Sequence, residues 1–96
     1  MASRNWYLLS YDVRDPRRLA RTARLAGHYG DRVQLSVFRL HLTGQQLAQL
    51  RWEMARIMEK DDDLMIVPVC ARCAQGIKLA GRADQWPPEP ELFEVV

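Results

Sequence analysis

The spacing of the apolar positions changes along the chain, and each change predicts a new element of secondary structure. Residues 5–13 form an apolar, aromatic run that is typical of a mostly buried strand. Asp15 is a preferred helix cap and Pro16 a preferred first helical residue. Apolar residues then recur at helical spacing, which predicts a helix over 16–28. We expect Gly30 to close this helix in a left-handed conformation.

Two further elements are predicted in the middle of the chain. Apolar and polar residues alternate over 31–42, which indicates either one kinked strand or two short strands hinged near Ser36. Thr43 and Gln46 have the spacing of a capping box, so a second helix should begin there and end near Lys60.

The last third of the chain is apolar at first and rich in proline later. Residues 64–70 have the composition of a buried strand, and Pro68 limits part of it to a sheet edge, a bulge or a strand end. Residues 77–80 are consistent with a short further strand. Residues 86–90 have the composition of an extended linker, and residues 92–96 that of a final short strand.

The order of these elements predicts an α+β fold. In a chain of 96 residues, two helices should cover one face of an antiparallel sheet, as in a ferredoxin-like βαββαβ sandwich. The other sheet face would be apolar and uncovered, so we expect a homodimer through the sheet face. The domain is expected to span residues 1–81. Residues 82–96 are expected to be a linker and a strand that pairs with the other subunit's sheet.

The composition is that of a globular protein. The chain is 48% hydrophobic and 27% charged, which argues against intrinsic disorder. No apolar run approaches the roughly 20 residues that span a bilayer, and the first residues lack the apolar core of a secretory signal. We therefore expect a cytoplasmic protein with no membrane partner.

Positive charge is concentrated in the first part of the chain. Residues 1–60 carry 11 Lys and Arg against 5 Asp and Glu, whereas residues 61–96 carry 3 against 7. Nearly all the basic residues are arginines, whose guanidinium groups bind phosphate oxygens in a bidentate manner. The distribution is consistent with nucleic-acid binding and equally with a solvated, arginine-rich surface.

Asp12 stands at the carboxyl end of the first predicted strand, where a carboxylate can meet solvent. One carboxylate is a poor Mg²⁺ site, because the ion requires several oxygen ligands in a near-octahedral arrangement. Two copies of Asp12 that face each other across a two-fold axis could hold one metal ion, polarise a phosphodiester and orient water. Arg14, Arg17 and Arg18 would then lie beside the metal to hold phosphates. The alternative is that Asp12 is only a turn residue.

Two other groups of residues are weaker candidates. The acids at 61–63 follow a helix C-terminus and are expected to form a solvated loop. Cys70-x-x-Cys73 has zinc-ligand spacing, but His28 and His41 are distant in the sequence. A thioredoxin-type pair requires a helix after a strand, and the residues after Cys73 lack a helical pattern. Neither zinc nor redox chemistry is therefore predicted.

Ser36 and Phe38 lie on the second β segment, which should pack near the first. Phe38 is explained equally well by core packing and by a functional role, either stacking on a base or backing a metal site. Ser36 is either a hydroxyl ligand or the hinge of the segment.

Three segments of the sequence together resemble one known family. They are Tyr11-Asp12-Val13 with Asp15-Pro16-Arg17-Arg18, Arg32-Val33-Gln34-Leu35-Ser36-Val37-Phe38 with Leu42-Thr43, and Leu64-Met65-Ile66-Val67-Pro68-Val69-Cys70. Over roughly residues 5–80 the chain resembles the small universal CRISPR-associated endonuclease of the adaptation module, the partner of the CRISPR integrase. The most specific part is the Gln-x-Ser-Val-Phe segment at its distance after Tyr-Asp.

The resemblance implies a ferredoxin-like homodimer that uses Mg²⁺ to cleave phosphodiester bonds in single-stranded RNA or double-stranded DNA. It also implies a role in spacer acquisition, in which the dimer bridges two integrase dimers and binds the incoming duplex. Asp12 matches the family's metal-binding acid. Four residues fall at other positions associated with activity, namely Arg17, Arg32, Ser36 and Phe38. The arginines expected to bind nucleic acid are Arg14, Arg17, Arg18 and Arg21.

Two other functions are compatible with the same fold. One is a non-catalytic bridge that binds duplex DNA in the integrase complex. The other is a stand-alone ribonuclease toxin of the virulence-associated protein D type. Asp12→Asn separates nuclease from bridge, because loss of cleavage with retained duplex binding and spacer capture would favour the bridge. A CRISPR array and an integrase gene in the gene neighbourhood would argue against the toxin.

Overall fold

The computed structural model describes residues 3–77, and these residues contain the predicted strands and helices up to the fourth strand. The elements are β1 (Asn5–Asp12), α1 (Pro16–Tyr29), β2 (Gly30–Gln34), β3 (Val37–Leu42), α2 (Gly44–Ile57), β4 (Asp63–Val69) and α3 (Ala71–Gln75). The predictions for residues 78–96, including the linker, the last strand and the domain boundary at 81, lie outside the described residues.

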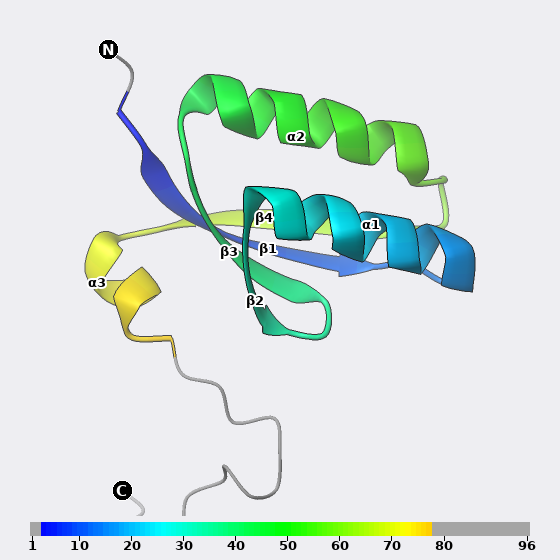
Figure 1. The fold of residues 1–96 in the computed structure, drawn as a ribbon, viewed down its shortest axis with the longest axis horizontal. Coiled ribbons are helices and arrows are strands. Elements are labelled where there is room, and N and C mark those ends of the chain that lie inside the picture. The colour runs from blue at the N-terminus through cyan, green and yellow to red at the C-terminus, as the bar shows by residue number, and fades with distance from the viewer. Residues whose placement is uncertain (1–2, 78–96) are drawn as a thin grey trace, which may run out of the picture.

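The four strands form one antiparallel sheet in the order β2-β3-β1-β4. Figure 1 shows α1 and α2 side by side over the same face of this sheet. The arrangement confirms the predicted α+β, ferredoxin-like fold. Pro68 lies on β4, which is an edge strand of the sheet, as its missing backbone N–H requires.

The core lies between the helices and the sheet. Alternation along β1 and β3 places Leu9 and Phe38 opposite each other on the helix-facing side, and both are buried. The helix α2 contributes Leu50 and Met54, both fully buried, from the predicted apolar stripe. These side chains belong to one contiguous cluster, so the helices are fixed to the sheet by a single apolar layer.

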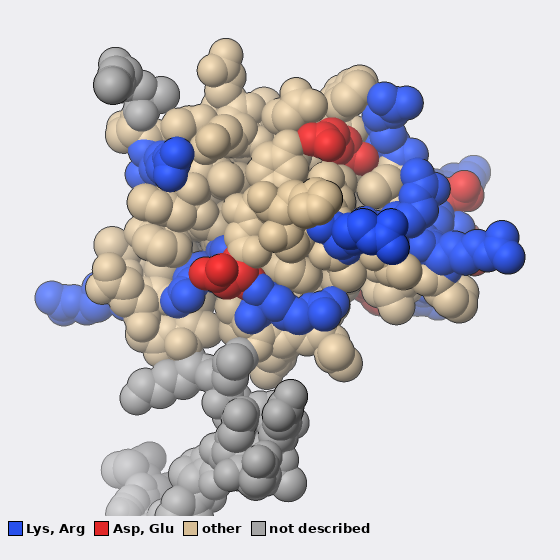
Figure 2. All heavy atoms as spheres, in the orientation of Figure 1, with Lys and Arg blue, Asp and Glu red and all other residues tan. Residues whose placement is uncertain are grey.

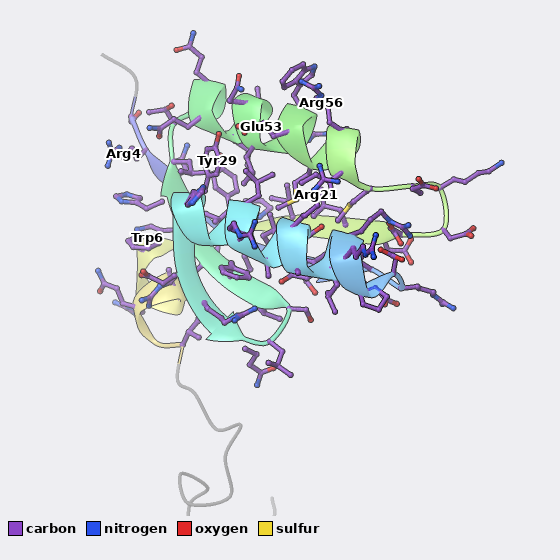
Figure 3. The ribbon with its side chains drawn as sticks, turned by 45° about the vertical axis from the view of Figure 1, so that its right-hand side comes forward. Arg4, Trp6, Arg21, Tyr29, Glu53 and Arg56 are labelled. Carbon is purple, nitrogen blue, oxygen red and sulfur yellow. The ribbon has the colours of Figure 1, made fainter. Side chains whose placement is uncertain are left out.

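The capping box at the start of α2 is present as predicted. Thr43 Oγ1 accepts a hydrogen bond from the Gln46 backbone N at 3.1 Å, and Gln46 Oε1 accepts one from the Thr43 backbone N at 2.9 Å. The helix ends at Ile57, slightly before the predicted end. Further along α2, the Tyr29 hydroxyl donates a hydrogen bond to Glu53 and so joins α1 to α2 (Figure 3). This hydrogen bond, with partial burial, raises the pKa of Tyr29 to about 12.

The alternating segment 31–42 forms two strands, which resolves the alternative that the sequence left open. The turn between them consists of Leu35 and Ser36, and β2 contains a register shift between Arg32 and Gln34. The hinge is therefore where it was expected, and the hairpin tip contains no glycine or asparagine.

Two local predictions were wrong. Gly30 has φ −166° and ψ −169°, an extended conformation that begins β2, and no glycine among residues 3–77 has a positive φ. The helix expected to be absent after Cys73 is present, because α3 spans Ala71–Gln75 and Cys70 caps it. The required order of strand, cysteine and helix is therefore present at Cys70-x-x-Cys73.

Gly30 is required for close packing of the backbone. A Cβ atom at this position would lie 2.2 Å from the Arg39 backbone oxygen and 2.6 Å from Leu40 Cδ2. We expect Gly30→Ala to lower the free energy of unfolding by about 1–3 kcal/mol or more, because backbone must shift. The matched control is Gly27→Ala in α1, where nothing lies within 4 Å of the added atom. This control should stabilise the protein by about 0.5–1 kcal/mol. Urea denaturation measures both, and a Gly30→Ala protein as stable as wild type would contradict the close approach.

The face of the sheet opposite α1 and α2, here called the open face, carries the alternate side chains of the strands. Its apolar residues include Leu8, Met65 and Val67, and Met65 and Val67 are 58% and 38% exposed. At one end of this face the Trp6 and His41 rings stack with their centroids 4.2 Å apart. Exposed apolar side chains on a sheet face are consistent with a partner surface.

None of the helices within residues 3–77 has the length and apolar character needed to traverse a bilayer.

Candidate functional site

Asp12 is the last residue of β1, and its carboxylate is exposed. Its register partner on the edge strand is Asp63, the first residue of β4, so two carboxylates stand opposite each other at one end of the open face. With Ser10 and Met65 they line a shallow hollow. Sequence reasoning missed Asp63, because the acids at 61–63 were interpreted as one solvated loop.

A larger cleft lies between the start of α1 and the β2–β3 turn. Its volume is about 480 Å³, and its lining includes Asp12, Arg32 and Ser36 together with apolar side chains such as Leu19 and Leu35. The fold thus brings together three of the five residues predicted to act in catalysis. Arg17 does not line this cleft, although it lies one residue after Pro16, which does.

The turn that forms one wall of the cleft is held in place by three hydrogen bonds. The Tyr11 backbone N donates to the Ser36 carbonyl at 3.2 Å, and the Tyr11 hydroxyl donates to the Leu35 carbonyl at 3.3 Å. Arg32 Nη2 donates to the same Leu35 carbonyl at 3.1 Å. Ser36 is therefore fixed beside the end of β1 by its backbone, and its hydroxyl is not needed to hold the turn.

Phe38 lies beneath Arg32 and belongs to the core. It is 2% exposed, and the Arg32 guanidinium carbon lies 5.3 Å from its ring centroid. Its ring also stacks with Tyr11, with centroids 6.1 Å apart. Phe38 therefore supports the cleft from inside, and stacking on a base would require it to leave the core.

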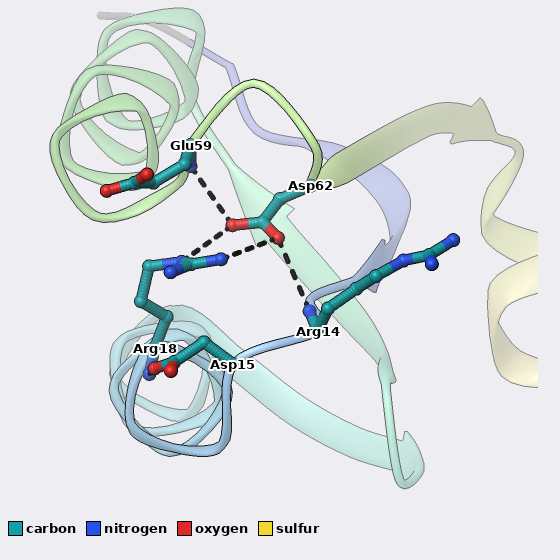
Figure 4. A network of polar contacts seen from close by, with 5 residues as sticks. All are labelled: Arg14, Asp15, Arg18, Glu59 and Asp62. Atoms are coloured by element: carbon teal, nitrogen blue, oxygen red, sulfur yellow. Dashed lines mark hydrogen bonds and ion pairs between the residues drawn. The ribbon is translucent and has the colours of Figure 1, made fainter.

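Asp62 contacts Arg14, Arg18 and Glu59 beside the candidate site, as Figure 4 shows. Its buried carboxylate forms an ion pair with Arg18, with Nε to Oδ2 at 2.9 Å and Nη2 to Oδ1 at 3.2 Å. It also accepts hydrogen bonds from the backbone N of Glu59 at 3.0 Å and of Arg14 at 3.3 Å. The prediction of a solvated loop was wrong for Asp62. Its buried carboxylate joins the α2–β4 loop to the β1–α1 turn that follows Asp12.

The same contacts determine the protonation of this group. The pKa of Asp62 is lowered from 3.8 to about 2, first by the hydrogen bond from Arg18 and then by that from Glu59 N. Because the folded-state pKa is depressed, the resulting stability is fully present above the unfolded-state value and is lost as the pH falls from about 4 towards 2. Between these values the unfolded chain binds more protons, so stability rises with pH.

We expect Asp62→Asn to unfold at a lower temperature than wild type at pH 7, because Arg18 loses its charged partner. Between pH 4 and 2 the variant should also show a shallower loss of stability than wild type. Thermal unfolding over a pH series measures both effects. The control is Asp61→Asn at the neighbouring exposed position. Identical acid profiles of Asp62→Asn and wild type would contradict the role of Asp62.

Basic side chains gather near the same end of the molecule. Figure 2 shows Lys and Arg concentrated over the end of the helical layer where α1 begins and α2 ends. Arg14, Arg17 and Arg21 are exposed there, and Arg56 comes from the last turn of α2. Arg18 differs from these residues because its guanidinium is paired with Asp62. Three of the four arginines predicted to bind nucleic acid are thus displayed to solvent beside the cleft.

The donor atoms available for a metal ion are the carboxylates of Asp12 and Asp63. Within residues 3–77 no group of three or more His, Cys, Asp or Glu side chains could hold a metal ion. Carboxylate oxygens are the ligand type that Mg²⁺ prefers, so these donors fit the ion in kind and fall short in number within one chain. A complete site would need ligands from outside this chain or from water.

The family model described as "CRISPR associated protein Cas2" matches residues 5–77, which include all seven elements. The chain belongs to the Cas2 family. A Cas2 relative from Chloroflexus aurantiacus, named "CRISPR-associated endoribonuclease Cas2 1", is 38% identical over 86 residues, which cover 88% of this chain and 90% of the relative. The resemblance read from the three sequence segments is thereby confirmed.

Solved Cas2 structures share the fold. The crystal structure of Streptococcus pyogenes Cas2 at pH 6.5 matches with a TM-score of 0.65 and 28% identity, over 73% of this chain and 90% of that one. A chain of a partial Cas6-RT-Cas1–Cas2 complex matches with a TM-score of 0.65 over 90% of this chain and 98% of that one. Its identity is 22%, so this second likeness is one of fold.

Proposed function

We propose that this Cas2 family member is a Mg²⁺-dependent endonuclease whose site forms between two copies of the chain. The observation that carries the proposal is the position of Asp12 and Asp63, opposite each other at one end of the open face. The name of the Chloroflexus relative supports a nuclease. The substrate class is RNA or DNA, because both present the same phosphodiester to this site.

A homodimer through the open face would complete the site. The exposed Met65 and Val67 side chains are in the same strand as Asp63, so a copy that covers them also approaches the acids. In a two-fold dimer the same patch faces itself, and each acid pair then has a symmetric counterpart nearby. Such a dimer would supply four carboxylates, in place of the two in one chain.

Five residues at this end of the sheet have defined parts in the proposal. Asp12, with Asp63 opposite it, would hold Mg²⁺. When bound, the ion polarises a phosphodiester and makes a coordinated water more acidic. Arg32 lines the cleft that Asp12 also lines, and its proposed role is to bind a phosphate oxygen there. Ser36 offers a hydroxyl at the same wall, and Phe38 keeps Arg32 in position from below.

The exposed arginines would hold the nucleic acid outside the cleft. Arg14, Arg17 and Arg21 offer guanidinium groups to successive phosphates, and this binding should weaken with increasing salt concentration. Arg18 contributes less to this surface than the other three, because Asp62 occupies its guanidinium. Its proposed role is to hold the turn that carries Asp12.

We further propose that the dimer acts in spacer acquisition together with the integrase Cas1. Cas2 family membership supports this assignment, and a Cas1–Cas2 complex contains a chain of the same fold. A bridge that binds duplex DNA without cutting it is the second candidate, and the exposed basic surface favours it independently of the acids.

A nuclease assay with a chelator control tests the proposed function. Purified full-length protein is incubated with single-stranded RNA and with duplex DNA, with Mg²⁺ and with EDTA, and the products are separated by size. Cleavage of either substrate in Mg²⁺ and its loss in EDTA is the expected result. Cleavage that EDTA does not change contradicts the metal mechanism. Tight duplex binding with no cleavage in Mg²⁺ identifies the bridge.

A further inference from the structure

Cys70 and Cys73 lie at the end of the sheet opposite the candidate site. The strand β4 begins at Asp63, beside Asp12, and ends at Val69, beside Trp6, so Cys70 follows at the far end. Both thiols are free and exposed to solvent. Neither cysteine contributes to the acids, the cleft or the exposed arginines described above.

The two cysteines are in contact within the first turn of α3. Cys70 caps the helix, and the Cys73 backbone N donates a hydrogen bond to Cys70 Sγ at 3.3 Å. The backbone that follows β4 therefore places the Cys70 sulfur against the first turn of the helix that carries Cys73.

Their surroundings give the two thiols different reactivity. Hydrogen bonds from the Cys73 backbone and then from its thiol lower the pKa of Cys70. The side-chain hydrogen bond to Cys70, followed by the charge of Cys70, raises the pKa of Cys73. A thiolate is the reactive form in disulfide exchange, so Cys70 is suited to attack first and Cys73 to attack second.

We propose that Cys70 and Cys73 form a reversible dithiol–disulfide pair that exchanges with low-molecular-weight disulfides. The Cys70 thiolate attacks one sulfur of a disulfide such as oxidised glutathione, which forms a mixed disulfide and releases one glutathione thiolate. Cys73 loses its proton to solvent and attacks Cys70 Sγ, which releases the second glutathione. Two protein thiols are oxidised, and one glutathione disulfide is reduced to two thiols.

The oxidation state of Cys70 and Cys73 can affect the open face, because the helix α3 contacts Arg39. Ala74 is fully buried, and its carbonyl accepts a hydrogen bond from Arg39 Nη1 at 3.0 Å. The Arg39 guanidinium carbon lies 5.8 Å from the Trp6 ring centroid. A bond between Cys70 and Cys73 would fix the first turn of α3 directly before these contacts. This proposal does not depend on the nuclease activity.

Mass spectrometry of the reduced, full-length protein treated with oxidised glutathione tests the pair. Wild type should become lighter by its two thiol hydrogens, without retaining glutathione, and dithiothreitol should reverse the change. Cys73→Ser should keep one glutathione on Cys70. Cys70→Ser should acquire glutathione at least about tenfold more slowly than Cys73→Ser, because Cys70 keeps the hydrogen bond from the backbone N of residue 73 in Cys73→Ser and this bond favours its thiolate.

The opposite results would overturn the proposal. These are a wild-type protein that retains glutathione on either cysteine, a disulfide that joins two chains, or equal rates for the two serine variants. Circular dichroism of each variant confirms that it is folded before the rates are compared. Both cysteines are exposed, so neither serine variant leaves a cavity in the core.

Discussion

The Asp12→Asn variant should lose at least about 100-fold in Mg²⁺-dependent cleavage while staying folded. Asn has nearly the same shape as Asp, and the side chain is exposed at the end of β1, so the change removes a charge and leaves the packing intact. The loss is large because a neutral amide oxygen is a weak ligand for Mg²⁺. Initial cleavage rates with saturating Mg²⁺ measure it, and circular dichroism reports the fold.

The control for this prediction is Asp61→Asn, which removes the same charge from an exposed position of the neighbouring loop. Its cleavage rate should stay within about twofold of wild type, because a solvated charge at this distance is largely screened. Equal activities of Asp12→Asn and wild type would remove Asp12 from the metal site. Duplex binding should persist in both variants, since the exposed arginines are unchanged.

Leu50→Ala should lower the free energy of unfolding by about 2–5 kcal/mol. Leu50 is fully buried in the middle of α2 and belongs to the cluster that joins the helices to the sheet. Truncation removes three carbon atoms from the core and leaves a cavity that the surrounding side chains fill only in part. Denaturation in urea, extrapolated to water, gives the value.

The same substitution at Leu35 is the matched control. Leu35 is 83% exposed at the β2–β3 turn, so Leu35→Ala should change the free energy of unfolding by less than about 0.5 kcal/mol. A loss below about 1 kcal/mol for Leu50→Ala, or equal losses for the two variants, would contradict the packing of α2 on the sheet.

The parts of the fold that local chemistry determines were predictable from the sequence. Thr43 and Gln46 form their capping box from residues three apart, and no distant residue is needed to recognise it. The sequence placed the hinge near Ser36 and left open whether residues 31–42 form one kinked strand or two, because no Gly or Asn-Gly marks a hairpin tip. The position of the β2–β3 turn depends on Tyr11, which is distant in sequence and donates two hydrogen bonds to the turn.

The candidate site also depends on contacts between residues that are distant in the sequence. Asp12 could be singled out because it ends an apolar strand, whereas Asp62 and Asp63 are adjacent and identical in type. Asp62 is buried against Arg18, and Asp63 begins a strand opposite Asp12. The ion pair with Arg18 and the register of β1 with β4 distinguish the two acids, and both are tertiary contacts that the sequence does not show. The helix α3 was missed for a related reason, since five residues are too few to show a helical repeat.

The central claim is that two copies of Asp12 serve one site across a two-fold axis, and mixed dimers test it most directly. Wild type and Asp12→Asn are unfolded together in equal amounts and refolded, so that subunits combine at random. If both acids are required, only dimers of two wild-type chains cut, and about one quarter of the wild-type activity should remain. A remaining activity of about one half, the value for chains that act independently, would contradict the shared site.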